Sequence, residues 1–259
     1  MPQKRHIATE QLSFNENMES LAEQRKYTEI FFARLKCVSS IHEQAKVLDI
    51  GAAGGTFLIA CNMLGYEGYG IEPWEGARTN ALKLSKHLNI PIQIMDGTAE
   101  CIPYEDNTFD VIHANSVLEH TLDIEKALGE IFRVLKPGGV FWFYTASSMC
   151  PFQGEIRGFP LFGWYPDPLK RRIMLWAKQT RPDLIGFSET PAINWFTPRK
   201  THALLRKHGF TQIYDRWDIR GETEGGRLYL LALHLIRKIR VVKLCADVVV
   251  PDCSYAAIK

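Results

Sequence analysis

Apolar and polar positions along this chain follow two different periods. A continuous apolar run of strand length occurs at residues 140–145, and Val47, Leu48 and Ile50 form a second apolar strand that contains Asp49. Longer segments between such strands carry an apolar residue every three or four positions. In residues 124–135 this spacing predicts an amphipathic helix, with its apolar face formed by Ile124, Ala127, Leu128, Ile131 and Leu135. Strands that alternate with helices predict an α/β fold with a doubly wound, mostly parallel sheet.

The same pattern places the other elements. We expect helices in the first forty residues and over 77–87, and strands over 46–50, 69–71, 90–95, 109–114, 140–145 and 254–258. The helix over 124–135 ends at a Lys-Pro-Gly-Gly turn, where proline and glycine stop it. The run at 140–145 is apolar throughout, which is typical of a strand buried on both faces.

A glycine-rich turn follows the first strand. Asp49 lies two residues before Gly51, and the next helix begins near Thr56 and is closed by Gly65. The second strand then ends at Glu72. This is a βαβ unit whose turn can form the floor of a nucleotide pocket, with a carboxylate at the strand tip where a ribose would lie.

Glycine spacing separates the two cofactor classes that use such a unit. The dinucleotide fingerprint G-x-G-x-x-G fails at Ala53 and Thr56, which argues against an NAD-type oxidoreductase. The pattern D-x-G-x-x-x-G over residues 49–55 instead resembles the first motif of class I S-adenosylmethionine (SAM)-dependent methyltransferases. That motif usually has a middle glycine where this chain has Ala53.

Four later segments resemble the same family in the same order. They are residues 99–110, Val117-Leu118-Glu119-His120, residues 133–139, and the pair Asn194–Pro198 with Leu204–Phe210. The resemblance covers about residues 27–145 and 193–220. It implies a seven-stranded Rossmann-like methyltransferase sheet with an antiparallel final strand, and SAM as cofactor with S-adenosylhomocysteine as product. The bacterial methyltransferases of quinone, natural-product and surface-polysaccharide pathways are the most similar in general character.

The resemblance also implies roles for single residues. Glu72, followed by Pro73, would accept hydrogen bonds from the ribose hydroxyls, and Asp49 with the turn would face the methionine end. The remaining cofactor contacts would come from Gly51, Ala52, Ala53 and Gly55 in the turn, Asp96, Thr98 and Ala99 near the adenine, Asn115 beside the sulfonium, and Tyr27 over the methionine end. For Tyr27 the alternative is a plain packing role.

Two histidines lie near the expected site. His120 follows the fourth strand at the carboxyl end of the sheet, so it is the candidate general base, and the alternative is that it packs under its loop. His113 lies inside the strand and is expected to be a hydrogen-bonded core residue. We expect no metal site.

We expect residues 1–259 to form a single methyltransferase domain. Its parts are N-terminal helices (1–45), the SAM-binding core (46–145), an inserted lid (146–195), and C-terminal strands with an apolar helix (196–259). The lid is rich in prolines and in aromatic residues, namely Phe152, Phe159, Phe162, Trp164, Tyr165, Trp176 and Phe187. Such a segment can bury an acceptor, and the alternative is a homodimer contact.

Residues 227–250 form a second unusual segment. Their spacing predicts one helix with an apolar stripe, made of Leu228, Leu231, Leu235, Ile239, Val242 and Ala246. A core-facing stripe is our first interpretation. A homodimer contact or peripheral contact with a membrane surface are the alternatives.

Composition excludes several classes. The formal net charge of +2 is too small to indicate nucleic-acid binding, and no apolar run has the length of a membrane span. The six cysteines are scattered without a C-x-x-C pair, and the N-terminus lacks a signal-peptide pattern, which together indicate a cytoplasmic protein with reduced thiols.

The sequence therefore predicts a SAM-dependent methyltransferase that acts on a small or carrier-linked metabolite, at oxygen. Methylation of nitrogen or carbon is one alternative. A non-catalytic SAM-fold protein with a binding or assembly role is the other, and Ala53 and Thr98 are the departures from the family pattern that permit it.

Overall fold

The computed structural model describes residues 14–152, 154–186, 190–220 and 225–259, with side chains from residue 20 onward. Part of the expected N-terminal helix and Phe187 of the expected lid therefore lie outside the described residues. The helices and strands, in chain order, are α1 (Phe14–Leu35), β1 (Lys46–Ile50), α2 (Thr56–Met63), β2 (Glu67–Ile71), α3 (Glu75–Leu88), β3 (Gln93–Met95), β4 (Phe109–Asn115), the 3₁₀ turn η2 (Leu118–His120), α4 (Ile124–Val134), β5 (Leu135–Ala146), η3 (Phe162–Trp164), α5 (Asp167–Thr180), η4 (Pro182–Leu184), α6 (Pro198–Lys207), β6 (Gln212–Asp215), α7 (Arg227–Lys238), α8 (Arg240–Val249) and β7 (Asp252–Ile258).

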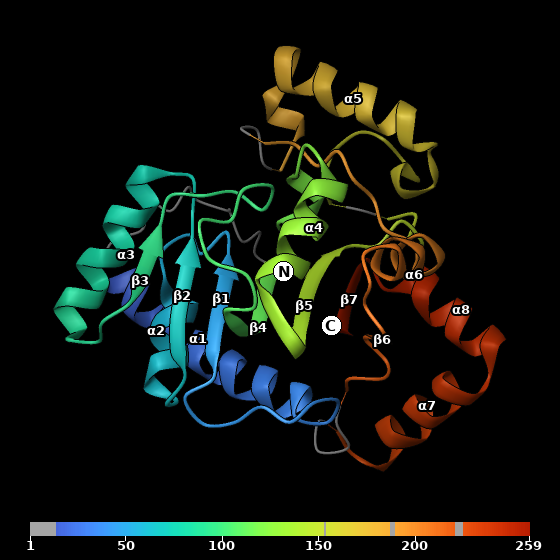
Figure 1. Ribbon diagram of the computed structural model, residues 1–259. Coiled ribbons are helices and arrows are strands. Elements are labelled where there is room, and N and C mark those ends of the chain that lie inside the picture. The colour runs from blue at the N-terminus through green and yellow to red at the C-terminus, as the bar shows by residue number, and fades with distance from the viewer. Residues whose placement is uncertain (1–13, 153, 187–189, 221–224) are drawn as a thin grey trace.

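Seven strands form one sheet in the order β3-β2-β1-β4-β5-β7-β6 (Figure 1). The first five strands along the chain are parallel, and β7 runs antiparallel to both of its neighbours, β5 and β6. The order reverses at β1, which pairs with β2 on one side and β4 on the other. The predicted doubly wound, mostly parallel sheet is confirmed. In this architecture ligands bind at the carboxyl ends of the strands next to the reversal.

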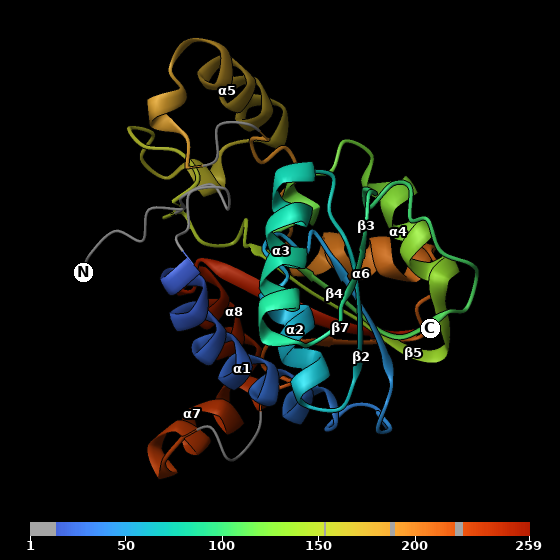
Figure 2. The ribbon, with the colours of Figure 1, turned by 90° about the vertical axis from the view of Figure 1, so that its left-hand side faces the viewer.

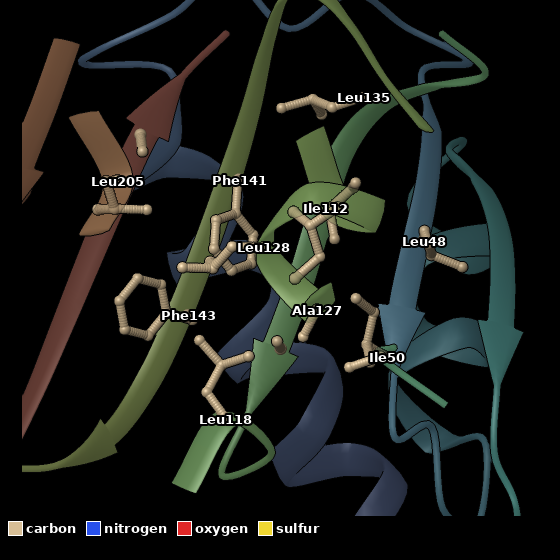
Figure 3. Close-up of a cluster of buried hydrophobic side chains, with 14 of the residues drawn as sticks. Leu48, Ile50, Ile112, Leu118, Ala127, Leu128, Leu135, Phe141, Phe143 and Leu205 are labelled. Carbon is tan, nitrogen blue, oxygen red and sulfur yellow. The ribbon is translucent and has the colours of Figure 1, made fainter. Parts of the chain in front are cut away.

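Helices cover both faces of the sheet, and each layer has its own core. On one face α4 and α6 pack over β1, β4 and β5, and Figure 3 shows Leu128 and Leu205 beside Phe141 and Phe143. On the other face α1 and α2 pack on Val47, Val111 and Trp142. Figure 2 shows α1, α7 and α8 on the side of the sheet opposite to α4.

Several elements differ by a few residues from the expected bounds. The third strand is shorter than predicted and begins at Gln93, because Pro91 has no N–H to donate to a neighbouring strand. The helix α4 ends at Val134, and the chain enters β5 at Leu135, so the turn at 136–139 already belongs to this strand.

The prediction for residues 227–250 is wrong in two respects. The segment forms two helices, α7 and α8, because Ile239 is extended, with φ −109° and ψ 108°. Ile239 is itself β-branched, as are Val241 and Val242 just after it, and such residues lower helix propensity. The apolar stripe also does not face the core: among the described residues of the two helices, Leu233 alone is buried. Within the described ranges, no helix combines the length and the apolar character that a bilayer crossing needs.

Candidate functional site

The glycine turn after β1 packs against the loop that follows β4. Gly51 and Gly55 both have a φ of 73°, in the left-handed region that favours glycine. A Cβ on Gly51 would lie 2.7 Å from Cγ2 of Val117, and one on Gly55 would lie 2.8 Å from Cβ of Ala81. The turn therefore needs glycine at both positions, for its backbone conformation and for space.

Ala53 adopts a left-handed backbone conformation. Its φ is 45°, which costs a residue with a Cβ roughly 1–2 kcal/mol. In this conformation the Ala53 N–H donates to Oε2 of Glu72 at 2.9 Å. The alanine therefore keeps the geometry of the turn at the cost of local strain.

Glu72 lies just beyond β2 with both carboxylate oxygens held by the backbone. Oε2 accepts the Ala53 N–H, and Oε1 accepts the Trp74 N–H at 3.0 Å. Burial is the main cause that raises the pKa of Glu72, and the two N–H donors oppose it. Arg78 donates to the Glu72 carbonyl at 2.6 Å and to Oδ1 of Asp96 at 3.0 Å. Arg78 thus links the tips of β2 and β3, a role that the sequence analysis missed.

A buried chain of polar groups lies beneath the turn. Asp49 Oδ1 is 2.7 Å from His113 Nδ1, and His113 Nε2 is 3.3 Å from the Tyr27 hydroxyl. The His113 ring stacks on Phe57, with centroids 4.0 Å apart, and on Trp142, at 5.0 Å. His113 is therefore the hydrogen-bonded core residue that its position in the strand indicates. The cofactor role of Tyr27 stays a prediction, and its contacts match the packing alternative.

The other predicted cofactor contacts lie along the same edge. Pro73, Asp96 and Thr98 are exposed beyond β2 and β3, and Asn115 is exposed at the end of β4, whereas Ala99 is buried. The structure joins Asp96 to the Glu72 group through Arg78. Thr98 and Asn115 share the edge of the sheet with that group.

His120 is half-buried in η2, next to residues 190 and 191 near the end of the expected lid. Burial lowers the pKa of His120, and hydrogen bonds with the backbone of Thr190 and Pro191 oppose this. The imidazole is thus neutral at pH 7, as a base must be. The same contacts also fit the packing alternative, because they fix the ring against a neighbouring segment.

Glu119 is a second buried acid that the sequence analysis missed. Its residue is 6% exposed, and burial raises its pKa to about 7, with a further contribution from the charge of Glu155. The Thr145 hydroxyl lies beside the carboxyl group and opposes the rise. Its place next to His120, in the loop after the fourth strand, is the feature of the sequence that could have indicated a role for Glu119. Its burial depends on the distant segment that covers it.

The segment expected to be a lid has a small core of its own. Seven buried residues form it, namely Ile156, Phe162, Met174, Ala177, Ile185, Ala192 and Trp195. Its α5 lies beyond the end of the sheet to which the strand arrows point (Figure 1). The Asn194 side chain joins this segment to η2, since Nδ2 donates to the carbonyls of Leu118 at 3.0 Å and Thr121 at 2.7 Å. The Glu119 carbonyl accepts two further backbone N–H groups from residues 193 and 194.

Comparison with known proteins agrees with this geometry. Residues 48–143 match the model of a methyltransferase domain family. The sterol 24-C-methyltransferase erg6 of Schizosaccharomyces pombe is 35% identical over 106 residues, which are 39% of this chain and 27% of that protein. The ubiquinone/menaquinone biosynthesis C-methyltransferase UbiE of Francisella tularensis is 36% identical over 110 residues, 39% of this chain and 42% of that protein. The matched region thus spans less than half the length of either relative.

A solved structure shows the same fold. The phosphoethanolamine N-methyltransferase 2 of Haemonchus contortus, in complex with SAM, superposes with a TM-score of 0.55 at 19% identity, covering 88% of this chain and 51% of that one. This likeness confirms the predicted fold class, and the match of residues 48–143 to a methyltransferase domain agrees with the predicted family resemblance. The division into core and lid, and the roles of the single site residues, stay predictions.

Proposed function

We propose, from the premise that residues 48–143 are a methyltransferase domain on a class I fold, that this protein is a SAM-dependent methyltransferase acting on a small or carrier-linked metabolite. The single observation that carries the proposal is the position of the Glu72 carboxylate beside the glycine turn. Two backbone N–H groups, from Ala53 and Trp74, hold it at the tip of β2.

The residues present fit SAM. Each Glu72 oxygen accepts one backbone hydrogen bond and, as a carboxylate oxygen, has capacity for a second, so the pair can bind the two ribose hydroxyls. Asp49, one of whose oxygens is engaged by His113, orients the methionine end of the site. The left-handed turn keeps the backbone close to the cofactor without side chains between them.

SAM when bound supplies a methyl group already activated by the sulfonium leaving group. The protein then aligns the acceptor and excludes water, and alignment alone is worth roughly 7–11 kcal/mol in favourable intramolecular models. We assign the exclusion of water to the segment 146–195, which Asn194 ties to η2 at the edge of the site. A hydroxyl acceptor also needs a base, and His120 is the candidate.

Oxygen as the methylated atom is a prediction that the relatives do not support. The two relatives are named as C-methyltransferases and the structural neighbour as an N-methyltransferase. N- or C-methylation is therefore a full alternative, and so is a non-catalytic SAM-fold protein, because Ala53 and Thr98 depart from the family pattern. A cytoplasmic location and a homodimer also stay predictions.

Calorimetric titration with SAM, S-adenosylhomocysteine and NAD tests the proposal. We expect binding of the first two and none of NAD. Glu72→Ala should weaken SAM binding by roughly 1.5–3 kcal/mol, the range for a hydrogen bond to a charged group. Glu67→Ala, which removes an exposed carboxylate from the same strand, is the matched control and should leave affinity unchanged. Equal SAM affinity in a folded Glu72→Ala protein would refute the assigned role.

A further inference from the structure

The helices α7 and α8 present apolar side chains to the outside of the molecule. Leu228 is 84% exposed, Val241 69% and Val249 76%, and Leu231 and Leu244 are more than half exposed. On α7 the exposed leucines 228, 231 and 235 are spaced three and four residues apart, so they form one face. An outward face this apolar marks an interaction surface more often than a solvated one.

Three polar side chains of the same helices, Arg237, Lys243 and Asp247, instead contact the rest of the molecule. Lys243 pairs with Asp215, and Asp247 accepts a hydrogen bond from the indole of Trp217 at 2.7 Å. Arg237 donates to the carbonyl of Trp217 at 2.8 Å and to that of Arg220, also at 2.8 Å. These contacts fix which face is inside. The apolar face therefore points outward, and it cannot turn to the core unless these contacts break.

Positive charge borders the apolar face. Arg227, Lys238 and Arg240 are exposed, and acidic side chains on α7 and α8 are limited, among the described residues, to the inward Asp247. On α7, the helical period places Arg227 and Lys238 along one side of the Leu228–Leu231–Leu235 stripe. An apolar face bordered by Lys and Arg is typical of a helix that lies in the interface of an anionic membrane.

We infer that α7 and α8 form a docking surface for an anionic lipid bilayer. A second copy of the chain fits this face poorly. A two-fold contact would bring the same three cations toward their counterparts, with no outward acidic group among the described residues of the two helices to pair with them. Lipid headgroups supply the complementary charge, at about 1 kcal/mol, or roughly fivefold in affinity, for each Lys or Arg near the surface.

The surface continues toward the candidate site. The Cys150 thiol lies 3.9 Å from the carbonyl of Val249, so the start of the segment 146–195 adjoins the end of α8. Phe152 and Trp164 of that segment are 75% and 58% exposed. The two helices and α5 lie on the same side of the molecule in Figure 2. Docking would bring this edge close to the bilayer, where an acceptor with a lipid tail would reside.

Vesicle co-sedimentation with the full chain tests the inference. We expect binding to vesicles of phosphatidylcholine mixed with phosphatidylglycerol, weak binding to phosphatidylcholine alone, and a loss of affinity as salt rises. Leu231→Glu combined with Leu244→Glu should abolish binding. Lys238→Ala combined with Arg240→Ala should weaken it about 30-fold. The matched controls are on α3: Leu82→Glu, and Lys83→Ala combined with Lys86→Ala, which change exposed side chains on another face.

The outcomes separate this inference from the proposed function. Circular dichroism reports the folding of each variant, and SAM affinity should be the same in all of them. Vesicle binding without SAM binding would uphold the docking surface and refute the proposed function. SAM binding without vesicle binding would uphold the proposed function and refute the docking surface. Equal binding by the α7–α8 variants and the α3 controls would overturn the inference. So would a dimer, detected by sedimentation velocity without lipid, that Leu231→Glu with Leu244→Glu dissociates.

Discussion

Substitution of Glu119 by glutamine should change how the stability of this protein depends on pH. Glu119 is almost fully buried, and its pKa is raised to about 7 by burial and by the charge of Glu155. In the unfolded chain the same group has its ordinary pKa of 4.5. Between these two values the native state holds a proton that the unfolded state has lost, so stability falls as pH rises through this window.

The size of the effect follows from the two pKa values. At about 1.4 kcal/mol for each pH unit, the native state loses about 3 kcal/mol of unfolding free energy between pH 4.5 and pH 7 through this one group. Glutamine has nearly the same shape and stays neutral, so it does not contribute this loss. The free energy of unfolding of the variant minus that of the parent should therefore be larger at pH 8 than at pH 5, by up to about 3 kcal/mol.

Urea unfolding of both proteins at several pH values measures this difference directly. Subtracting the two curves removes the titration of all groups that do not interact with position 119. It also removes any constant difference in hydrogen bonding between glutamine and protonated glutamate. Parallel curves from pH 5 to pH 8 would refute the reasoning. They would mean that Glu119 is ionised or hydrated in the native protein.

Two further predictions concern the site itself. Ala53→Gly should raise the free energy of unfolding by about 0.5–1 kcal/mol, because relief of the left-handed strain exceeds the added entropy of the unfolded chain. SAM affinity should not fall. If urea unfolding finds the variant less stable than the parent, Ala53 is not strained. His120→Ala should keep most of its turnover at saturating SAM but lose stability, since its ring is fixed by the backbone of Thr190 and Pro191. A 10²–10⁴-fold drop in turnover, with a parent rate that falls in acid below pH 6.5, would instead establish His120 as the general base.

The parts of this molecule that the sequence predicts well are those set by local chemistry. The turn at 51–55, the carboxylate at Glu72 and the alternation of strands and helices each follow from residues close together in the chain, and the fold confirms them. The sequence indicates Tyr27, Asp49 and His113 separately, but their mutual contacts span 64 and 86 residues, and no short pattern indicates such pairs.

The orientation of α7 and α8 was not predictable for a related reason. Periodicity tells which residues share a face, but it does not tell which face meets the protein. Here Asp215 and Trp217, from another part of the chain, bind Lys243 and Asp247 and so hold the polar side of α8 against the protein. The burial of Glu119 likewise depends on a segment that follows it by dozens of residues.

The position of β7 bears on the order in which the sheet can assemble. β7 lies between β5 and β6, although it follows both along the chain. During synthesis, β6 emerges with no hydrogen-bonded neighbour. The strand β5, which contains Phe141 and Phe143, remains an open edge until β7 arrives. Such an edge is a site for association between nascent chains. Pulse-labelling hydrogen exchange during refolding should therefore find the amides of β6 protected no earlier than those of β7, and earlier protection of β6 would exclude this order.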